Sequence, residues 1–411
     1  MKYRLCLILG TLLFAFQQSH SQNIYNSPYS VYGVGMLNKR TSSLNRGMAG
    51  TGIAVQDEFN LNHVNPASYG SITNPISHIF ELGLYVESNQ FKSRTLSDSK
   101  SNGGITTMNY WFKLNKWWAS TLGLSPFSSM SYKISQSQNL GAITNVDYQY
   151  EGTGNISEIY WGNSFNVVKN LSIGANVSFL FGSLSKNESI ATGASQTIRL
   201  EDKVTTNKFH IDFGAQYAIH LGERKLVVGV TADNGLKFNG KNKYILSSNS
   251  DTLNNTKGED RKYRLPRNGG FGLALHTKRS IIAADLKYEN WKDDASFPEN
   301  QNTRFEDSWK IGVGYEYKGD PNATNFLGLI GLRGGFYTQN YYMRVNGATF
   351  DQWGLAGGLS IPVFDNKSSI NLTYTYDRLG TDKNNLILQT SQKIALEVVM
   401  RDLWGIRRKF D

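Results

Sequence analysis

The feature that most constrains the fold is an alternation of apolar and polar residues with a period of two, which starts near residue 76 and continues almost to the C-terminus. It is clearest over 79–86, 171–179, 209–217 and 393–400, where one set of alternate residues is apolar and the other is polar or small. Successive side chains of a β-strand point to opposite faces of a sheet, so this period indicates strands. We therefore predict an all-β chain.

Segments with this pattern recur along the chain and are separated by clusters of Gly, Asn, Asp and Ser. We expect about 14 strands and leave 16 open, because one or two of the segments are expected to be loop hairpins. The candidate segments are 78–88, 104–115, 117–125, 129–139, 146–154, 156–169, 171–184, 207–220, 225–238, 267–277, 280–291, 305–317, 325–340, 350–362, 368–378 and 390–402.

The connections between these segments are of two kinds. Some are very short, as at 114–116, 168–170, 221–223, 276–278 and 364–367, whereas 185–206, 239–266, 292–304 and 379–389 are long and polar. Short turns at one end and long loops at the other are typical of an antiparallel transmembrane β-barrel of the bacterial outer membrane. A secreted soluble sandwich or propeller is the alternative, although no repeat of blade length is visible.

Composition agrees with a barrel. Hydrophobic residues make up 39% of the 411 residues and the mean hydropathy is −0.40, which excludes a polytopic helical membrane protein, because each helix would need about 20 apolar residues. Lipid offers no water to backbone groups, so strands cross a membrane only as a closed sheet. Such a sheet is apolar on its lipid side and polar inside, which keeps the average hydropathy low.

The first residues have the pattern of an export signal. A basic start at Lys2 and Arg4 precedes an apolar run over 5–16, and Ser19-His20-Ser21 supplies residues for a cut before Gln22. We expect 1–21 to be a signal peptide; an uncleaved anchor is the alternative. Cys6, the one cysteine, would leave with it, so we expect neither a disulfide nor a thiol nucleophile.

Residues 22–75 lack the alternation and are rich in Gly, Asn and Ser. A barrel of about 14 strands has a lumen wide enough to need filling. We therefore predict three parts: the signal peptide 1–21, an N-terminal hatch or plug over 22–75, and a transmembrane barrel over 76–411 that ends in a short basic tail.

Two motifs carry a family resemblance. The run Asn45-Arg46-Gly47-Met48-Ala49-Gly50-Thr51-Gly52-Ile53-Ala54-Val55-Gln56-Asp57 and the box Asn65-Pro66-Ala67-Ser68 resemble the hatch of FadL-like outer-membrane transporters, including OmpP1/PorV-type barrels of Bacteroidota. The resemblance covers about 45 residues, and Ser68 stands where that family has Gly. It implies uptake of hydrophobic compounds through a hatch-gated lumen.

The resemblance also implies site residues. The hatch and gating positions would be Gly47, Gly50, Gly52, Asp57, Asn65, Pro66 and Ala67. Asn65 and Pro66 could equally form only a turn that fixes the plug to the first strand. Asp57 with Glu58 could bind calcium or pair with Arg46, and the exposed edges of the barrel offer Trp117, Trp118, Tyr341 and Tyr342 to a ligand or an interface.

Enzyme and cofactor chemistry is not indicated. There is no Gly-x-Ser-x-Gly elbow and no pair of His residues with zinc spacing, so we expect no enzyme, no metal and no cofactor. The formal net charge is +10, but the basic residues are scattered, and we expect no nucleic-acid partner. The one basic cluster, Arg401 with 407–409, is expected to meet a membrane surface or a partner.

Two functions fit these observations. The first is passive uptake of a hydrophobic small molecule, which leaves either past a shifted hatch or through a gap in the wall. The alternative is a non-transporting barrel that serves as a subunit of an outer-membrane secretion or protein-assembly complex. Expected partners are outer-membrane lipid and either a hydrophobic ligand or other outer-membrane proteins.

Overall fold

The computed structural model describes residues 27–72, 76–139, 145–192, 196–248, 251–294, 303–345, 347–363, 368–383 and 386–402. The predicted signal peptide and most of the basic tail lie outside these residues. Within them, no helix is long and apolar enough to cross a membrane.

Fourteen antiparallel strands close into a barrel. They follow one another round the wall in chain order, and β19 pairs with β2 from Leu388 opposite Lys92 to Asp402 opposite His78. The wall strands are β2 (His78–Lys92), β3 (Ser97–Lys113), β4 (Trp118–Asn139), β5 (Asn145–Val168), β6 (Leu171–Thr192), β7 (Gln196–Leu221), β8 (Arg224–Asp233), β12 (Asn268–His276), β13 (Ser280–Glu289), β15 (Ser308–Tyr317), β16 (Gly331–Val345), β17 (Ala348–Val363), β18 (Ser368–Leu379) and β19 (Leu388–Asp402).

The remaining elements are additional to the 14 wall strands. They are η1 (Pro28–Val31), β1 (Met36–Leu37), α2 (Ser43–Gly47), η2 (Pro66–Ser71), β9 (Leu236–Ser248), β10 (Asp251–Lys257), β11 (Arg261–Leu265), α3 (Trp291–Asp294), β14 (Thr303–Phe305) and α4 (Phe326–Leu329). The strand count of 14 is confirmed, because the candidates 117–125 and 129–139 form one strand, β4, and 146–154 and 156–169 form another, β5.

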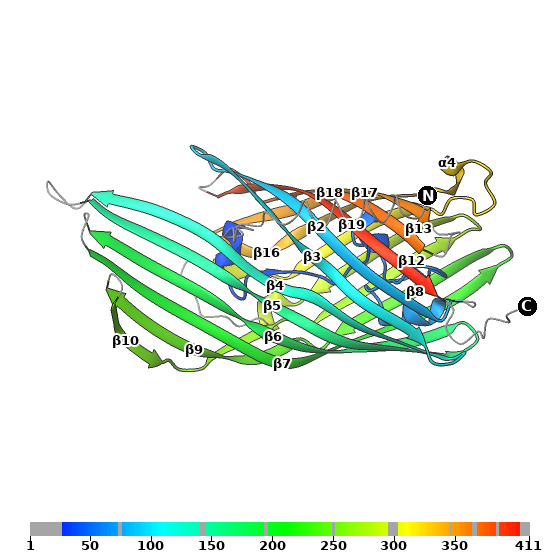
Figure 1. Cartoon of the computed structure of the whole chain (residues 1–411), viewed down its shortest axis with the longest axis horizontal. Helices are drawn as coiled ribbons and strands as arrows, with labels where there is room; N and C mark the ends of the chain where they lie inside the picture. The colour runs from blue at the N-terminus through cyan, green and yellow to red at the C-terminus, as the bar shows by residue number, and fades with distance from the viewer. Residues whose placement is uncertain are drawn as a thin grey trace, which may run out of the picture.

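The wall is much taller on one side than on the other (Figure 1). Strand β7 has 26 residues and β12 has 9, so at about 3.4 Å a residue they extend about 90 Å and about 30 Å. The sequence assigned the segments 185–206 and 239–266 to polar loops, but both consist mostly of strands. Segment 185–206 belongs to β6 and β7, which pair from Leu171 to Thr192, and segment 239–266 belongs to β9, β10 and β11, of which β9 continues the sheet beside β7. We call the part of β4–β7 and β9 above the membrane band the tall wall.

The alternation of side chains reverses with height in the tall wall. In the lower part of β7, Phe209, Phe213 and Tyr217 point outward and are exposed to lipid. Above them the outward residues are polar, as at Arg199 and Lys203, whereas the inward positions of neighbouring strands are apolar. These inward apolar residues are Ile134, Tyr148, Tyr150, Ile190, Ile198, Leu200, Val204 and Leu246.

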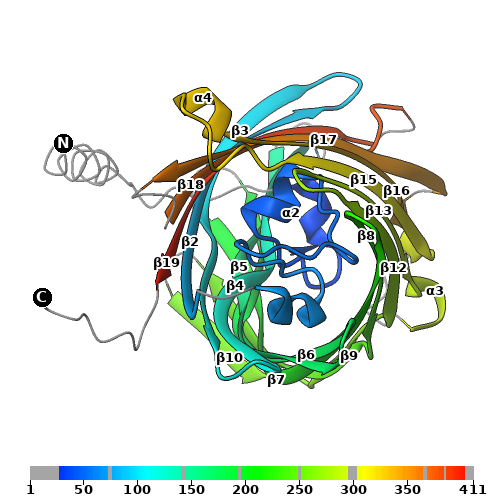
Figure 2. The same cartoon turned by 90° about the vertical axis from the view of Figure 1, so that its right-hand side faces the viewer.

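Residues 27–72, which we call the inner segment, lie inside the barrel (Figure 2). Its first part packs near the end with the long connections, where Ser27 bonds to Gln389 at 2.6 Å, and its last part lies near the short turns, where the indole of Trp111 donates to the carbonyl of Tyr69 at 3.1 Å. The inner segment therefore runs most of the length of the lumen.

Candidate functional site

The inner segment rests on glycines of the wall. A Cβ added to Gly174 in β6 would collide with Pro66, one at Gly214 in β7 with Asn65, and one at Gly335 in β16 with Met48. Similar collisions would occur at Gly229, Gly272 and Gly314. Backbone can approach backbone this closely only where side chains are missing. The lower half of the inner segment is thus fitted to the wall on several strands.

The glycine run of the inner segment binds a wall carboxylate. Asp285 of β13 accepts hydrogen bonds from the backbone N–H of Gly52 at 2.7 Å and of Ile53 at 3.0 Å. Gly50 has φ +82°, a left-handed conformation that turns the chain after α2, and Gly47 leaves only 3.0 Å between an added Cβ and Arg333. These predicted positions therefore act through their backbone.

The predicted Asn-Pro-Ala box forms the start of η2. The side chain of Asn65 accepts from the N–H of Ala67 at 3.0 Å and caps η2, with Pro66 in the first turn. The amide of Asn65 also donates to the carbonyl of Ile53 at 2.7 Å and to those of Ala215 and Val230 at 3.3 Å. The box is both a turn and a contact between the inner segment and the wall.

Asp57 has a different partner from the one the sequence suggested. Its carboxylate forms an ion pair with Lys318 at 2.8 Å, in the connection after β15, and not with Arg46. Burial alone would raise the pKa of Asp57, but Lys318 and the N–H groups of Phe59 and Asn60 outweigh burial and hold that pKa well below its usual value. Sequence separation hid this pair, because Lys318 is 261 residues away.

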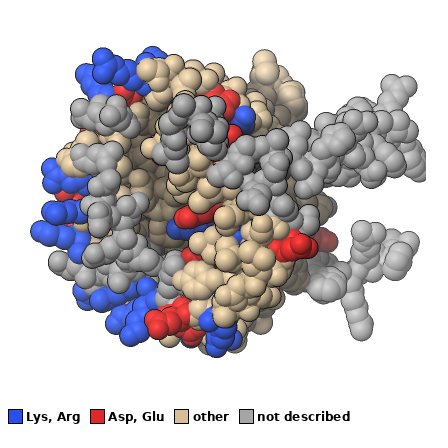
Figure 3. Space-filling view, turned by 90° about the vertical axis from the view of Figure 1, so that its left-hand side faces the viewer, with Lys and Arg blue, Asp and Glu red and all other residues tan. Residues whose placement is uncertain are grey.

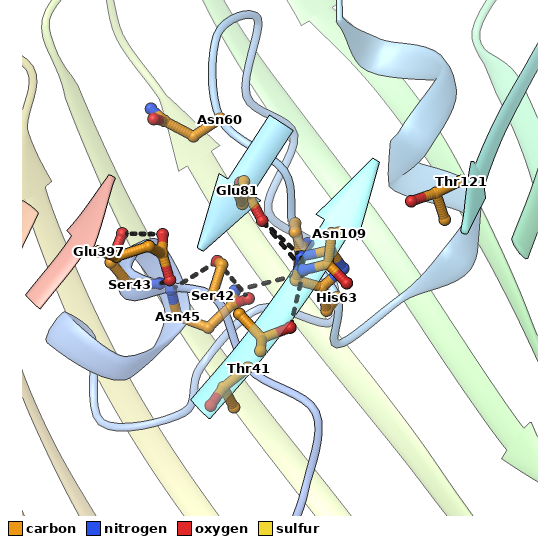
Figure 4. A network of polar contacts seen from close by, with 12 residues as sticks. Thr41, Ser42, Ser43, Asn45, Asn60, His63, Glu81, Asn109, Thr121 and Glu397 are labelled. Carbon is orange, nitrogen blue, oxygen red and sulfur yellow. Dashed lines mark hydrogen bonds and ion pairs between the residues drawn. The ribbon is translucent and has the colours of Figure 1, made fainter. Parts of the chain in front are cut away.

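A polar cluster joins the inner segment to β2, β3 and β19 (Figure 4). His63 lies 2.8 Å from both Glu81 and Asn109, and Ser43 bonds to Glu397 through its N–H at 2.9 Å and its hydroxyl at 2.6 Å. These side chains are buried. These contacts join the inner segment to three wall strands, so the cluster holds the inner segment in place.

Arg40 is the residue that sequence reasoning missed. Its guanidinium lies 3.0 Å from Glu158 of β5, pairs also with Asp212 of β7, and stacks 4.7 Å above the ring of Tyr160. Burial alone would lower the pKa of Arg40, but the two carboxylates outweigh burial and hold this pKa well above its usual value. The available signal was the presence of carboxylates at lumen-facing positions of two predicted strands.

The structure does not bring the predicted aromatic pairs together. Trp117 and Trp118 stack with Phe165 at 5.8–6.0 Å beside a short turn. Tyr341 and Tyr342 lie at the opposite end, where Tyr342 is 3.8 Å from the ring of Trp291 and both tyrosines are buried. Arg401 lies in β19, as the candidate strand 390–402 predicted, and its side chain donates to the carbonyl of Phe59 in the inner segment at 2.6 Å.

The wall has a gap between β3 and β4. Within the described residues these strands pair only from Met108 to Lys113, and Pro126 marks a bulge where β4 turns away. The hairpin of β2 and β3 leans out at this point (Figure 2). A cavity of about 490 Å³ lies behind the gap, bounded by Tyr85, Ile105, Met130 and Lys393 among others. Residues of β1 occupy part of the free edge of β4, with Met36 opposite Ser129.

Comparison with solved structures identifies the fold. The Ralstonia pickettii toluene transporter TbuX is 16% identical, with a TM-score of 0.60 over 89% of this chain and 99% of that one. A Pseudomonas aeruginosa FadL homologue is 13% identical (TM-score 0.61, 89% and 99%), and the P. putida toluene transporter TodX is 17% identical (0.60, 90% and 100%). This chain shares their fold, and two of these three neighbours are named as toluene transporters.

Sequence comparison gives a narrower result. No curated protein matches the chain. One family model, BamG, matches residues 2–411 and therefore almost the whole chain. The chain belongs to the BamG family.

Proposed function

We propose that this protein is a sealed outer-membrane barrel that serves as a subunit of a protein-assembly complex and binds a partner protein on the inner face of its tall wall. This is the second of the two functions that the sequence left open. The family match covers residues 2–411 and favours this second function, whereas the likeness to the toluene transporters rests on the fold alone.

The observation that carries the proposal is the reversed alternation of the tall wall. Ile198 is 47% exposed and Leu200 37% exposed although both point inward. A β-sheet that stands above the membrane needs no apolar face unless something covers it, because exposed apolar area costs about 25 cal/mol per Å². The height of this wall, far beyond the membrane band of about 25 Å, suits a protein partner.

The contacts of the inner segment argue against a moving hatch. Its backbone is fitted to wall glycines, Asp285 binds two of its N–H groups, and Arg40 pairs with the buried Glu158 and the partly buried Asp212. A shift would break several charged hydrogen bonds at about 1.5–3 kcal/mol each. A segment with these contacts closes the lumen permanently.

The experiment compares three variants on one strand. I198E and L200E place charges on the inner face of β7, and R199E, between them, changes charge on the outer face. We expect the inner-face variants to lower the amount of other folded barrels in the outer membrane, and R199E to leave it unchanged. Equal effects of all three, or of none, would contradict the proposal.

The second candidate is uptake of a hydrophobic compound through the gap between β3 and β4. The gap favours it, because the gap joins the cavity near Tyr85 and Ile105 to the membrane side of the wall. Its test is uptake of labelled toluene in cells that have the protein and in cells depleted of it. Equal rates in the two strains would remove this candidate.

A further inference from the structure

A cavity of about 210 Å³ lies in the lumen between the inner segment and the wall strands β7, β8, β12, β13 and β15. Its lining contains charged side chains of both signs. The cationic or basic ones are Lys39, Arg40, His63, His210, Lys287 and Lys310, and the acidic ones are Glu158, Asp212, Asp233 and Glu289. Charged atoms can be seen in the central hollow of the molecule from the end with long connections (Figure 3).

Every carboxylate in this lining already has a basic side chain as its partner. Glu158 and Asp212 pair with Arg40, Asp233 lies 2.8 Å from His210, and Glu289 pairs with Lys39. Two lysines remain, Lys287 of β13 and Lys310 of β15. In the described part of the chain neither forms an ion pair or donates a hydrogen bond to a protein group.

The nearest carboxylates outside the lining have other donors. Asp285 accepts from the N–H groups of Gly52 and Ile53, and Asp377 accepts from the hydroxyl of Tyr337. The ammonium of Lys310 lies 3.6 Å from the centre of the Tyr337 ring, which is a cation–π contact and not a hydrogen bond or an ion pair. Wall carboxylates attract both lysines electrostatically, Asp285 and Glu289 acting on Lys287 and Asp377 and Glu289 on Lys310, but none of these carboxylates forms an ion pair with either lysine in the described part of the chain.

Two ammonium groups that line one cavity repel each other, and the low dielectric of the surrounding protein strengthens this repulsion. An anion between them removes it. We infer that Lys287 and Lys310, with Lys39 beside them, bind a free oxyanion of the phosphate class. The ammonium of lysine binds phosphate as a point charge without a fixed geometry. The position inside the lumen favours a free anion over a lipid headgroup.

The test is equilibrium dialysis of the purified full-length protein in mild detergent against labelled inorganic phosphate at low chloride. We expect saturable binding of one phosphate per barrel. K287Q and K310Q should each weaken binding at least tenfold. K393Q is the matched control, because Lys393 faces the neighbouring cavity and pairs with Glu87 at 3.3 Å, and it should bind as the unchanged protein does.

Heat-modified migration on a gel confirms that each variant is folded before dialysis. No saturable binding by the unchanged protein would overturn the inference, and so would equal binding by all three variants. Displacement of the labelled phosphate by short-chain phosphatidic acid would overturn the assignment to a free anion.

Discussion

Asp57 of the inner segment and Lys318 of the connection after β15 form an ion pair with 2.8 Å between their charged atoms. This pair joins the inner segment to the end of the barrel that has the short turns. The side chain of Asp57 is 1% exposed and that of Lys318 is 26% exposed. The pair therefore lies at the edge of the buried region.

The first prediction concerns pH. The pKa of Asp57 is lower in the folded protein than its usual value of 3.8, so the pair adds stability above about pH 4 and loses it as the pH falls further. D57N should lower the free energy of unfolding by about 1.5–3 kcal/mol at pH 7. The difference should shrink below pH 4, as measured by urea unfolding in detergent. A difference that stays constant from pH 7 to pH 3 would contradict this account.

The second prediction concerns the wall glycines that contact the inner segment. G214A places a methyl group against Asn65, and we expect a loss of about 1–3 kcal/mol, because the inner segment must shift. G334A is the control, since an added Cβ there meets no atom within 4 Å. The temperature at which the folded band disappears from a gel measures both variants. Equal temperatures for the two would show that the close contact is not needed.

The third prediction concerns Arg40. R40M should destabilise the barrel by about 3–5 kcal/mol, because it leaves the buried Glu158 and the partly buried Asp212 without a cation. Adding E158Q and D212N should recover much of the loss, since the uncompensated charges are then removed. Urea unfolding of the single and triple variants measures this. If the triple variant is no more stable than R40M, the charge argument is wrong.

The fourth prediction concerns movement of the inner segment. Met36 and Ser129 are opposite each other on paired strands, so a disulfide between M36C and S129C is within reach. It would lock β1 to the edge of β4. We expect cells that contain the locked protein to grow at the same rate as cells in which the same variant is kept reduced. Growth that depends on reduction would indicate that the inner segment must move.

The sequence was enough for the barrel, because period-two alternation and turn residues are local signals. The pattern predicted too many segments, because turn-forming residues interrupt it in two strands. These residues are Pro126 and nearby small residues in β4, and Gly152 and Gly154 in β5. In the structure both strands continue past them, because each is paired with its neighbours on either side of the interruption. The tall wall was read as polar loops because its outward residues, such as Arg199 and Lys203, are polar there.

The site was less predictable for a different reason. The glycines of the inner segment could be located, but their contacts with Asp285 and the wall join residues more than 200 positions apart. The pairing of Arg40 with Glu158 and Asp212 depends on strand register, which no local pattern determines. A single sequence therefore does not predict which distant residues pair with one another in the site.

The central claim is that the inner face of the tall wall binds a protein partner. The most direct measurement is cross-linking in living cells from a photoreactive residue at position 200, with position 199 as the outward-facing control and mass spectrometry to identify the product. We predict one recurrent outer-membrane protein attached at position 200 and not at 199. Cross-links to lipid or to no protein at position 200, together with uptake of toluene that depends on the protein, would contradict the claim and favour the channel.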